Sequence, residues 1–286
     1  MSASDNPAEA TFHCSITPRY TDLDTWRHVN NSRIYQLHQE ARVLAHLDMF
    51  GKDAWFSDGI RLRPLRAVTD YRLVSWYGSD IQAQVQVLAC AKEAYQVRCD
   101  LYQDGNHVGV QQCLIGAFDN GQRVDLPQAT RDRLEQASRD RPMDLAPADY
   151  IERLETASEF PVRQPLTPRY ADLDADSQRS EAALARYMEQ ARFSGIRSLD
   201  MGGLGILIAS ADISFLQYRP GFDPIDLTSG ITRIGNSSFV FTGCARYQGA
   251  MQAAANSVMV VIDTASNRPV PIPDSLREQL LGLSLR

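Results

Sequence analysis

An acidic turn that leads into a helix holds the residues of this sequence best suited to chemistry. Asp22 and Asp24 lie two positions apart, and His28 and Asn30 follow before a stretch with helical spacing. A carboxylate such as that of Asp24 can act as a general base on water or as a nucleophile. The first turn of a helix leaves backbone N–H groups unpaired and carries partial positive charge. The N–H groups of Asn30 and Asn31 are therefore predicted to stabilise an oxyanion beside that carboxylate.

Most of this turn occurs twice in the chain. Residues 17–24 and 167–174 differ only where Thr21 is replaced by Ala171, and similar apolar spacing follows each copy. Two copies of ordinary domain length indicate a duplicated domain rather than a solenoid. We predict the following organisation: an N-terminal domain with the fuller motif over 1–140, a linker over 141–158, and a C-terminal domain over 159–286.

The bulk composition fits two ordinary domains in a reducing compartment. The chain has 286 residues, 44% of them apolar, which can supply two cores. Its net charge of −6 argues against nucleic-acid binding and against binding to an anionic membrane surface. No apolar run approaches the roughly 20 residues of a membrane span, and residues 1–10 predict a disordered tail rather than a secretory signal. The five cysteines lack C-x-x-C spacing, so we expect free thiols and a cytoplasmic protein.

The periodicity of apolar residues predicts an α+β fold in each copy. A helix is expected from Asn30 or Asn31, both good N-cap residues, to a stop at Gly51. Residues 81–87 alternate strictly, which is typical of a strand with one buried face. Positive-φ dipeptides predict tight turns between antiparallel strands. These dipeptides are Asp104-Gly105 and Asn120-Gly121, and in the second copy Gly235-Asn236 and Gln248-Gly249 are expected to supply the turns. In the second copy, strands are expected near 206–218, 225–234, 239–247 and 251–262, and short closing helices are expected over 127–136 and 273–281.

The motif from Asp22 to Asn31, with Glu40 to Arg42 after it, resembles that of the hot-dog-fold thioesterases. These include the 4-hydroxybenzoyl-CoA thioesterase group and the plant-type fatty-acyl carrier-protein thioesterases, which are tandem hot dogs. The resemblance implies a tandem hot-dog chain, each half a curved antiparallel sheet wrapped around one long central helix. It also implies hydrolysis of acyl-CoA or acyl-carrier-protein thioesters in fatty acid metabolism. We expect no cofactor and no metal ion.

The resemblance also assigns residues. In those families the second aspartate of the turn is the catalytic carboxylate, which is Asp24 here. The plant-type enzymes add a histidine and a glutamate, whose positions are His28 and Glu40. They also have an asparagine where this chain has Trp26, which removes an amide that would help to hold the carboxylate or a water molecule. The residues expected to bind substrate are Trp26, Asn30 and Asn31.

Each predicted catalytic residue also has a structural interpretation. Asp24 recurs as Asp174, so it can simply bind backbone N–H groups in a turn before a helix. His28 can be a satisfied turn histidine, and Glu40 can pair with Arg42. The second copy lacks the other motif residues, which predicts one working site per chain. It carries Gln178, Ser180, Glu181 and Gln190 in place of His28, Asn30, Asn31 and Glu40.

Two other functions stay open from the sequence. One is a non-catalytic protein that binds acyl thioesters, which Trp26 and the altered second copy make reasonable. The other is a hot-dog hydratase or dehydratase acting on an enoyl thioester. Alternating strands with exposed edges also allow the chains to pair as a homo-oligomer.

Overall fold

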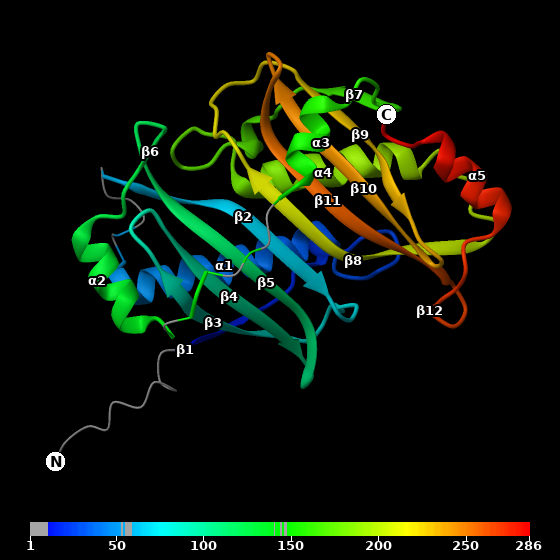
Figure 1. The fold of residues 1–286 in the computed structure, drawn as a ribbon. Coiled ribbons are helices and arrows are strands. Elements are labelled where there is room, and N and C mark those ends of the chain that lie inside the picture. Colours follow the sequence, from blue (N-terminus) through cyan, green and yellow to red (C-terminus); the bar gives the residue numbers. More distant parts are fainter. Residues whose placement is uncertain (1–10, 53, 55–58, 140, 144, 146–147) are drawn as a thin grey trace. The chain divides into compact units, whose positions relative to one another are not determined.

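The computed structural model describes residues 11–52, 54, 59–139, 141–143, 145 and 148–286 (Figure 1). The chain divides into two compact units, Met1–Ala146 and Pro147–Arg286. The predicted tail over 1–10 and part of the predicted linker lie outside the described residues.

The N-terminal unit is an antiparallel sheet with one long helix, α1, on its inner face (Figure 1). The strand order is β1-β3-β4-β5-β2, and β6 pairs with the end of β5. Ile34, Leu37 and Ala41 of α1 pack on the inward residues of β3 and β4, which form the core of this unit. The elements are β1 (Thr11–Ile16), η2 (Tyr20–Asp22), α1 (Asn31–Phe50), β2 (Arg61–Tyr71), β3 (Ile81–Cys90), β4 (Ala94–Gln103), β5 (Asn106–Asp119), β6 (Gln122–Val124) and α2 (Gln128–Ala137).

The C-terminal unit repeats this strand order as β7-β9-β10-β11-β8, with β12 on β11. Helix α4 lies on one face of its sheet (Figure 1). Tyr150 and Leu154 of α3 pack against Cys244 and Met251 on the other face, so this end of the predicted linker belongs to the unit. The elements are α3 (Tyr150–Thr156), β7 (Val162–Leu166), η3 (Tyr170–Asp172), α4 (Glu181–Ile196), β8 (Leu204–Phe215), β9 (Ile225–Ile234), β10 (Ser238–Tyr247), β11 (Ala250–Asp263), β12 (Arg268–Pro269) and α5 (Asp274–Gly282).

Local sequence signals explain where these elements begin and end. Asn30 caps α1 by accepting a hydrogen bond from the Ser32 N–H, and Gly51 ends the helix with a φ of 97°. Three of the predicted turn dipeptides have positive φ at both positions, which matches the twist of antiparallel hairpins. The antiparallel sheets and the few helices expected from the sequence are therefore confirmed. Among the described residues, no helix is long and apolar enough to cross a membrane.

Candidate active site

Asp24 lies at the start of a short loop that leads into α1. Leu23 and Val29 form an isolated antiparallel bridge that closes the loop. The Asp24 N–H donates to the His28 carbonyl at 2.9 Å. The Oδ1 atom of Asp24 accepts the backbone N–H groups of Trp26 at 2.8 Å and His28 at 3.1 Å. Its Oδ2 atom accepts no hydrogen bond from the described residues, so one carboxylate oxygen holds the loop and the other is available to a water molecule or a substrate.

The second copy builds the same loop around Asp174. Its Oδ1 atom accepts the N–H groups of Asp176 at 3.0 Å and Gln178 at 3.1 Å, and Leu173 bridges Arg179. The structural interpretation of this aspartate therefore holds in both copies. Any functional difference between the two loops has to come from their surroundings.

The carboxylate two residues earlier accepts hydrogen bonds within its own turn in both copies. Asp22 is buried and accepts the Arg19 backbone N–H at 2.8 Å and the Arg19 guanidinium at 3.1 Å. Burial raises the pKa of the matching Asp172. Hydrogen bonds from the Arg169 N–H and from Tyr187 and Arg186 outweigh this effect and leave the pKa below its usual value.

The first residues of α1 are partly occupied by local bonds. The Asn30 N–H donates to the Asp22 carbonyl at 2.8 Å, so this donor is already paired and the predicted oxyanion role does not suit it. Its side-chain oxygen accepts the N–H and hydroxyl of Ser32 at 2.8 and 2.7 Å. Asn31 is the first residue of α1, and its carbonyl accepts the Tyr71 hydroxyl at 3.2 Å. The N–H groups of Ser32, Arg33 and Ile34 also donate to Asn30, so the oxyanion role stays a prediction for Asn31.

The ring of His28 contacts two indole rings. Its centroid is 4.7 Å from that of Trp76 and 6.3 Å from that of Trp26, both edge-on. Trp26 and Trp76 are 46% and 52% exposed. Sequence reasoning missed Trp76, although an aromatic pair in the polar loop after a strand was a usable signal. The structure thus pairs His28 with Asp24 through the backbone and with aromatic rings through its side chain.

Glu40 lies further along α1 than the residues that directly follow the Asp24 loop. It is nine residues beyond Asn31, which is about 14 Å along the helix axis, and its side chain is exposed. No hydrogen bond among the described residues joins it to Asp24 or His28. Its charge acts on Arg19 and on Cys14, where burial first and Glu40 second raise the pKa of the thiol.

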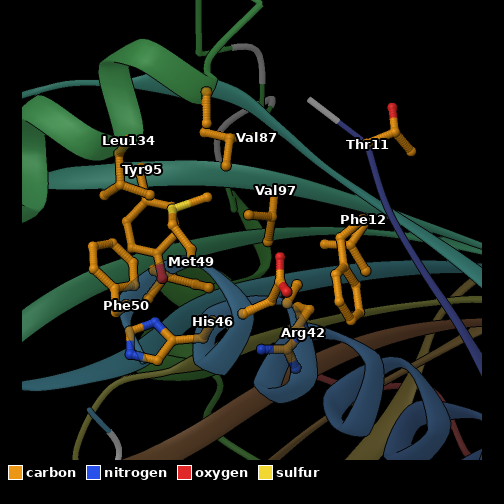
Figure 2. Close-up of a pocket in the computed structure, with 15 residues that line it drawn as sticks. Thr11, Phe12, Arg42, His46, Met49, Phe50, Val87, Tyr95, Val97 and Leu134 are labelled. Carbon is orange, nitrogen blue, oxygen red and sulfur yellow. The ribbon is translucent and has the colours of Figure 1, made fainter. Parts of the chain in front are cut away.

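A pocket of about 210 Å³ opens at the other end of α1 (Figure 2). In Figure 2, His46 and Phe50 of α1 converge with Tyr95 of β4 and Leu134 of α2. Burial lowers the pKa of His46 to about 4, so this ring is neutral near pH 7. The pocket is lined by Thr11, Phe12, Arg42, Ala45, His46, Asp48, Met49, Phe50, Val85, Val87, Tyr95, Val97, Ile115, Leu134 and Ala137. Its walls are mostly apolar, and Asp24 is not among them.

Polar side chains are also buried between α1 and the sheet. Arg42 donates to the Gln111 side chain at 3.1 Å, and Gln111 donates to the Thr69 hydroxyl at 3.0 Å. His38 is fully buried. Neither of its ring nitrogens has a hydrogen-bond partner among the described residues. Within those residues, no group of three His, Cys, Asp or Glu side chains is arranged to hold a metal ion.

Comparisons with known proteins relate part of this chain to a known superfamily. Residues 18–134 match the model of the thioesterase-like superfamily, so the N-terminal unit carries a thioesterase-like region. The resemblance predicted from the turn motif is thereby confirmed. A comparison of the sequence with curated proteins gave no significant match.

Solved structures of thioesterases share the fold. The 12:0-ACP thioesterase of Umbellularia californica superposes with a TM-score of 0.68 at 12% identity, covering 88% of this chain and 94% of that one. An acyl-ACP thioesterase of Bacteroides thetaiotaomicron gives a TM-score of 0.64 at 10% identity, covering 89% and 99%. At these identities the likeness is one of fold.

Proposed function

We propose that this protein hydrolyses acyl thioesters and that Asp24 carries the reaction. The observation that supports this most is the thioesterase-like match over residues 18–134, which includes the Asp24 loop, α1 and the sheet strands β2 to β5. In keeping with the fold of the two solved thioesterases, we further propose a tandem hot-dog architecture with one working site per chain.

The Asp24 loop supports a base-catalysed route. The Oδ2 atom would take a proton from a water molecule while the water oxygen attacks the thioester carbonyl carbon. Partial positive charge at the start of α1, where Asn31 lies, would stabilise the developing oxyanion. The C–S bond then breaks, and the sulfur leaves as a thiol with the proton that Asp24 had taken. Alternatively, Oδ2 attacks the carbonyl carbon directly, the C–S bond breaks, and the thiolate leaves and takes a proton from water. A water molecule then hydrolyses the resulting mixed anhydride to the carboxylic acid and regenerates the Asp24 carboxylate.

The other predicted residues take assisting roles in this proposal. His28 holds the loop through its two backbone hydrogen bonds to Asp24, and its ring contacts the exposed tryptophans beside the loop. Glu40 is exposed and makes no hydrogen bond to Asp24 or His28 among the described residues, so it is proposed to act through its charge, and its removal should cost less than removal of the Asp24 carboxylate. The pocket beside Ala45 and His46 is proposed to receive part of the acyl chain because its walls are mostly apolar.

The test compares two matched aspartates. Asp24→Asn keeps an oxygen that can accept the Trp26 and His28 N–H groups but removes the base, so thiol release from acyl-CoA should fall by about 10²–10⁴-fold. Asp174→Asn makes the same change in the matching loop and should retain most activity. Thiol release is followed with a thiol reagent, and circular dichroism shows that both variants fold. Equal losses in the two variants would contradict a single site at Asp24.

A non-catalytic thioester-binding protein is the second candidate. The bonds that Asp24 Oδ1 makes within its loop, repeated at Asp174, give an aspartate at this position a structural use, which supports this candidate. Binding of acyl-CoA with no thiol release at any chain length would favour this function. Addition of water to an enoyl-CoA without thiol release would instead favour a hydratase.

A further inference from the structure

An exposed aromatic cluster borders the Asp24 loop of the N-terminal unit. We define the indole platform as Trp26 and Trp76 together with the His28 ring that contacts both. An exposed apolar side chain on its own is ordinary, but neighbouring exposed apolar side chains mark a binding surface. Here two tryptophans that contact one histidine ring leave about half of their surface exposed. The Tyr20 and Tyr77 rings extend the cluster, with centroids 6.2 Å apart.

The backbone holds the platform in place without help from the indole rings. The Val29 N–H donates to the Ser75 carbonyl at 2.8 Å, which ties the loop after β2 to the Asp24 loop. The buried Gln103 side chain accepts the Trp76 N–H at 2.8 Å and donates to the Trp76 and Ser79 carbonyls at 2.8 and 2.9 Å. The Trp26 N–H is fixed by Asp24 at 2.8 Å. The backbone that carries the two rings is thus held by hydrogen bonds, so less of it has to be ordered when a ligand stacks on them.

The second copy of the motif lacks these rings although its backbone is built the same way. The Arg179 N–H donates to the Arg219 carbonyl at 3.0 Å, which matches the bond between Val29 and Ser75. The platform positions are occupied there by Asp176, Gln178 and Pro220. The fold therefore does not require the rings, and they occur only beside the copy with the fuller motif.

We infer that the indole platform binds the adenine of coenzyme A in the thioester substrate. This inference rests on the proposed hydrolysis of thioesters, which have two carriers. Coenzyme A ends in a flat purine with phosphates, whereas a carrier protein presents the pantetheine arm without a base. Exposed aromatic rings bind any base through its π-face. The exposed Arg27, next to Trp26 in the chain, supplies a positive charge for the phosphates.

Binding is tested first, without hydrolysis. The probe is adenosine 3′,5′-bisphosphate, titrated against the full-length protein by calorimetry. Trp76→Ala should weaken binding about tenfold, the loss expected for one base–aromatic stack. Trp76→Phe keeps an aromatic face and should stay within about threefold of the natural protein. Phe222→Ala removes an exposed ring of the C-terminal unit and should leave binding unchanged.

Kinetics then separate the platform from the reaction centre. The same acyl group is offered on coenzyme A and on pantetheine, which lacks the nucleotide. Trp76→Ala should lower kcat/KM for the coenzyme A thioester, relative to kcat/KM for the pantetheine thioester, about tenfold. An unchanged ratio, no binding of the nucleotide, or turnover of acyl-carrier protein with none of acyl-CoA would each overturn the inference. Nucleotide binding that depends on Trp76 without thiol release from any thioester would support the platform and refute the proposed hydrolysis.

Discussion

Replacing His38 by methionine should make the protein less sensitive to acid. His38 is fully buried in the N-terminal unit, and neither ring nitrogen has a partner among the described residues. Burial first, and then the charges of Arg42 on the same helix and His107 on β5, lower the pKa of His38 to about 3 from 6.5. Methionine is a matched replacement because Met188 occupies this position, also buried, in the second copy.

The size of the effect follows from proton linkage. Above pH 6.5 the imidazole is neutral in both states and contributes no pH dependence. As the pH falls below 6.5, the unfolded chain binds a proton that the folded protein excludes until about pH 3. The free energy of unfolding therefore falls by up to about 1.4 kcal/mol per pH unit. Between pH 7.5 and 5.0 this one group should cost about 2 kcal/mol.

The assay is urea denaturation at pH 7.5 and 5.0, followed by circular dichroism. The His38→Met variant should lose about 2 kcal/mol less than the natural protein between the two pH values. At pH 7.5 it should be at least as stable, because an unpartnered polar group leaves the core. His13→Gln changes an exposed histidine and should keep the natural pH dependence. The same pH dependence in the His38 variant and the natural protein would refute the assigned burial of a neutral imidazole.

Three further predictions concern the pocket, the loop and the thiols. Ala45→Phe places a ring in the pocket beside α1. This variant should lower kcat/KM at least about tenfold for long-chain acyl-CoA but not for short-chain acyl-CoA. An unchanged dependence of kcat/KM on chain length would exclude the pocket as the acyl site. Gln103→Leu removes three hydrogen bonds to the Trp76 loop. It should lower the free energy of unfolding in urea by about 1–3 kcal/mol and weaken nucleotide binding. An unchanged free energy of unfolding would show that other contacts hold the loop. Burial raises the pKa of the Cys99 and Cys244 thiols, so Ellman's reagent at pH 8 should modify them only after unfolding in urea; rapid reaction of all five cysteines in the native protein would contradict this.

Local patterns in the sequence were enough for most of the fold. Asn30 and Gly51 mark the ends of α1 because a cap and a positive-φ stop are properties of a few adjacent residues. The alternation in β3 and the turn at Asp104-Gly105 are local in the same way. The Asp24 loop could be recognised because its bonds to Trp26 and His28 lie within five residues of chain.

Contacts between distant segments could not be read from those patterns. The resemblance predicts a role for Glu40, but its exposure depends on which face of α1 the sheet covers, and the motif does not encode that. The pairing of the Asn30 N–H with the Asp22 carbonyl depends on how the turn folds back, which residue type does not encode.

The sequence by itself determined the duplicated motif, the helix that follows it and the acidic loop at its start, because neighbouring residues fix these features. Only the tertiary structure decided that Trp76 meets His28 and that His38 is enclosed without a partner. Those contacts join segments that are far apart in the chain, and they depend on strand register and on bonds such as those from Gln103 to the Trp76 loop. Trp76 and His38 therefore gain their surroundings only in the folded sheet.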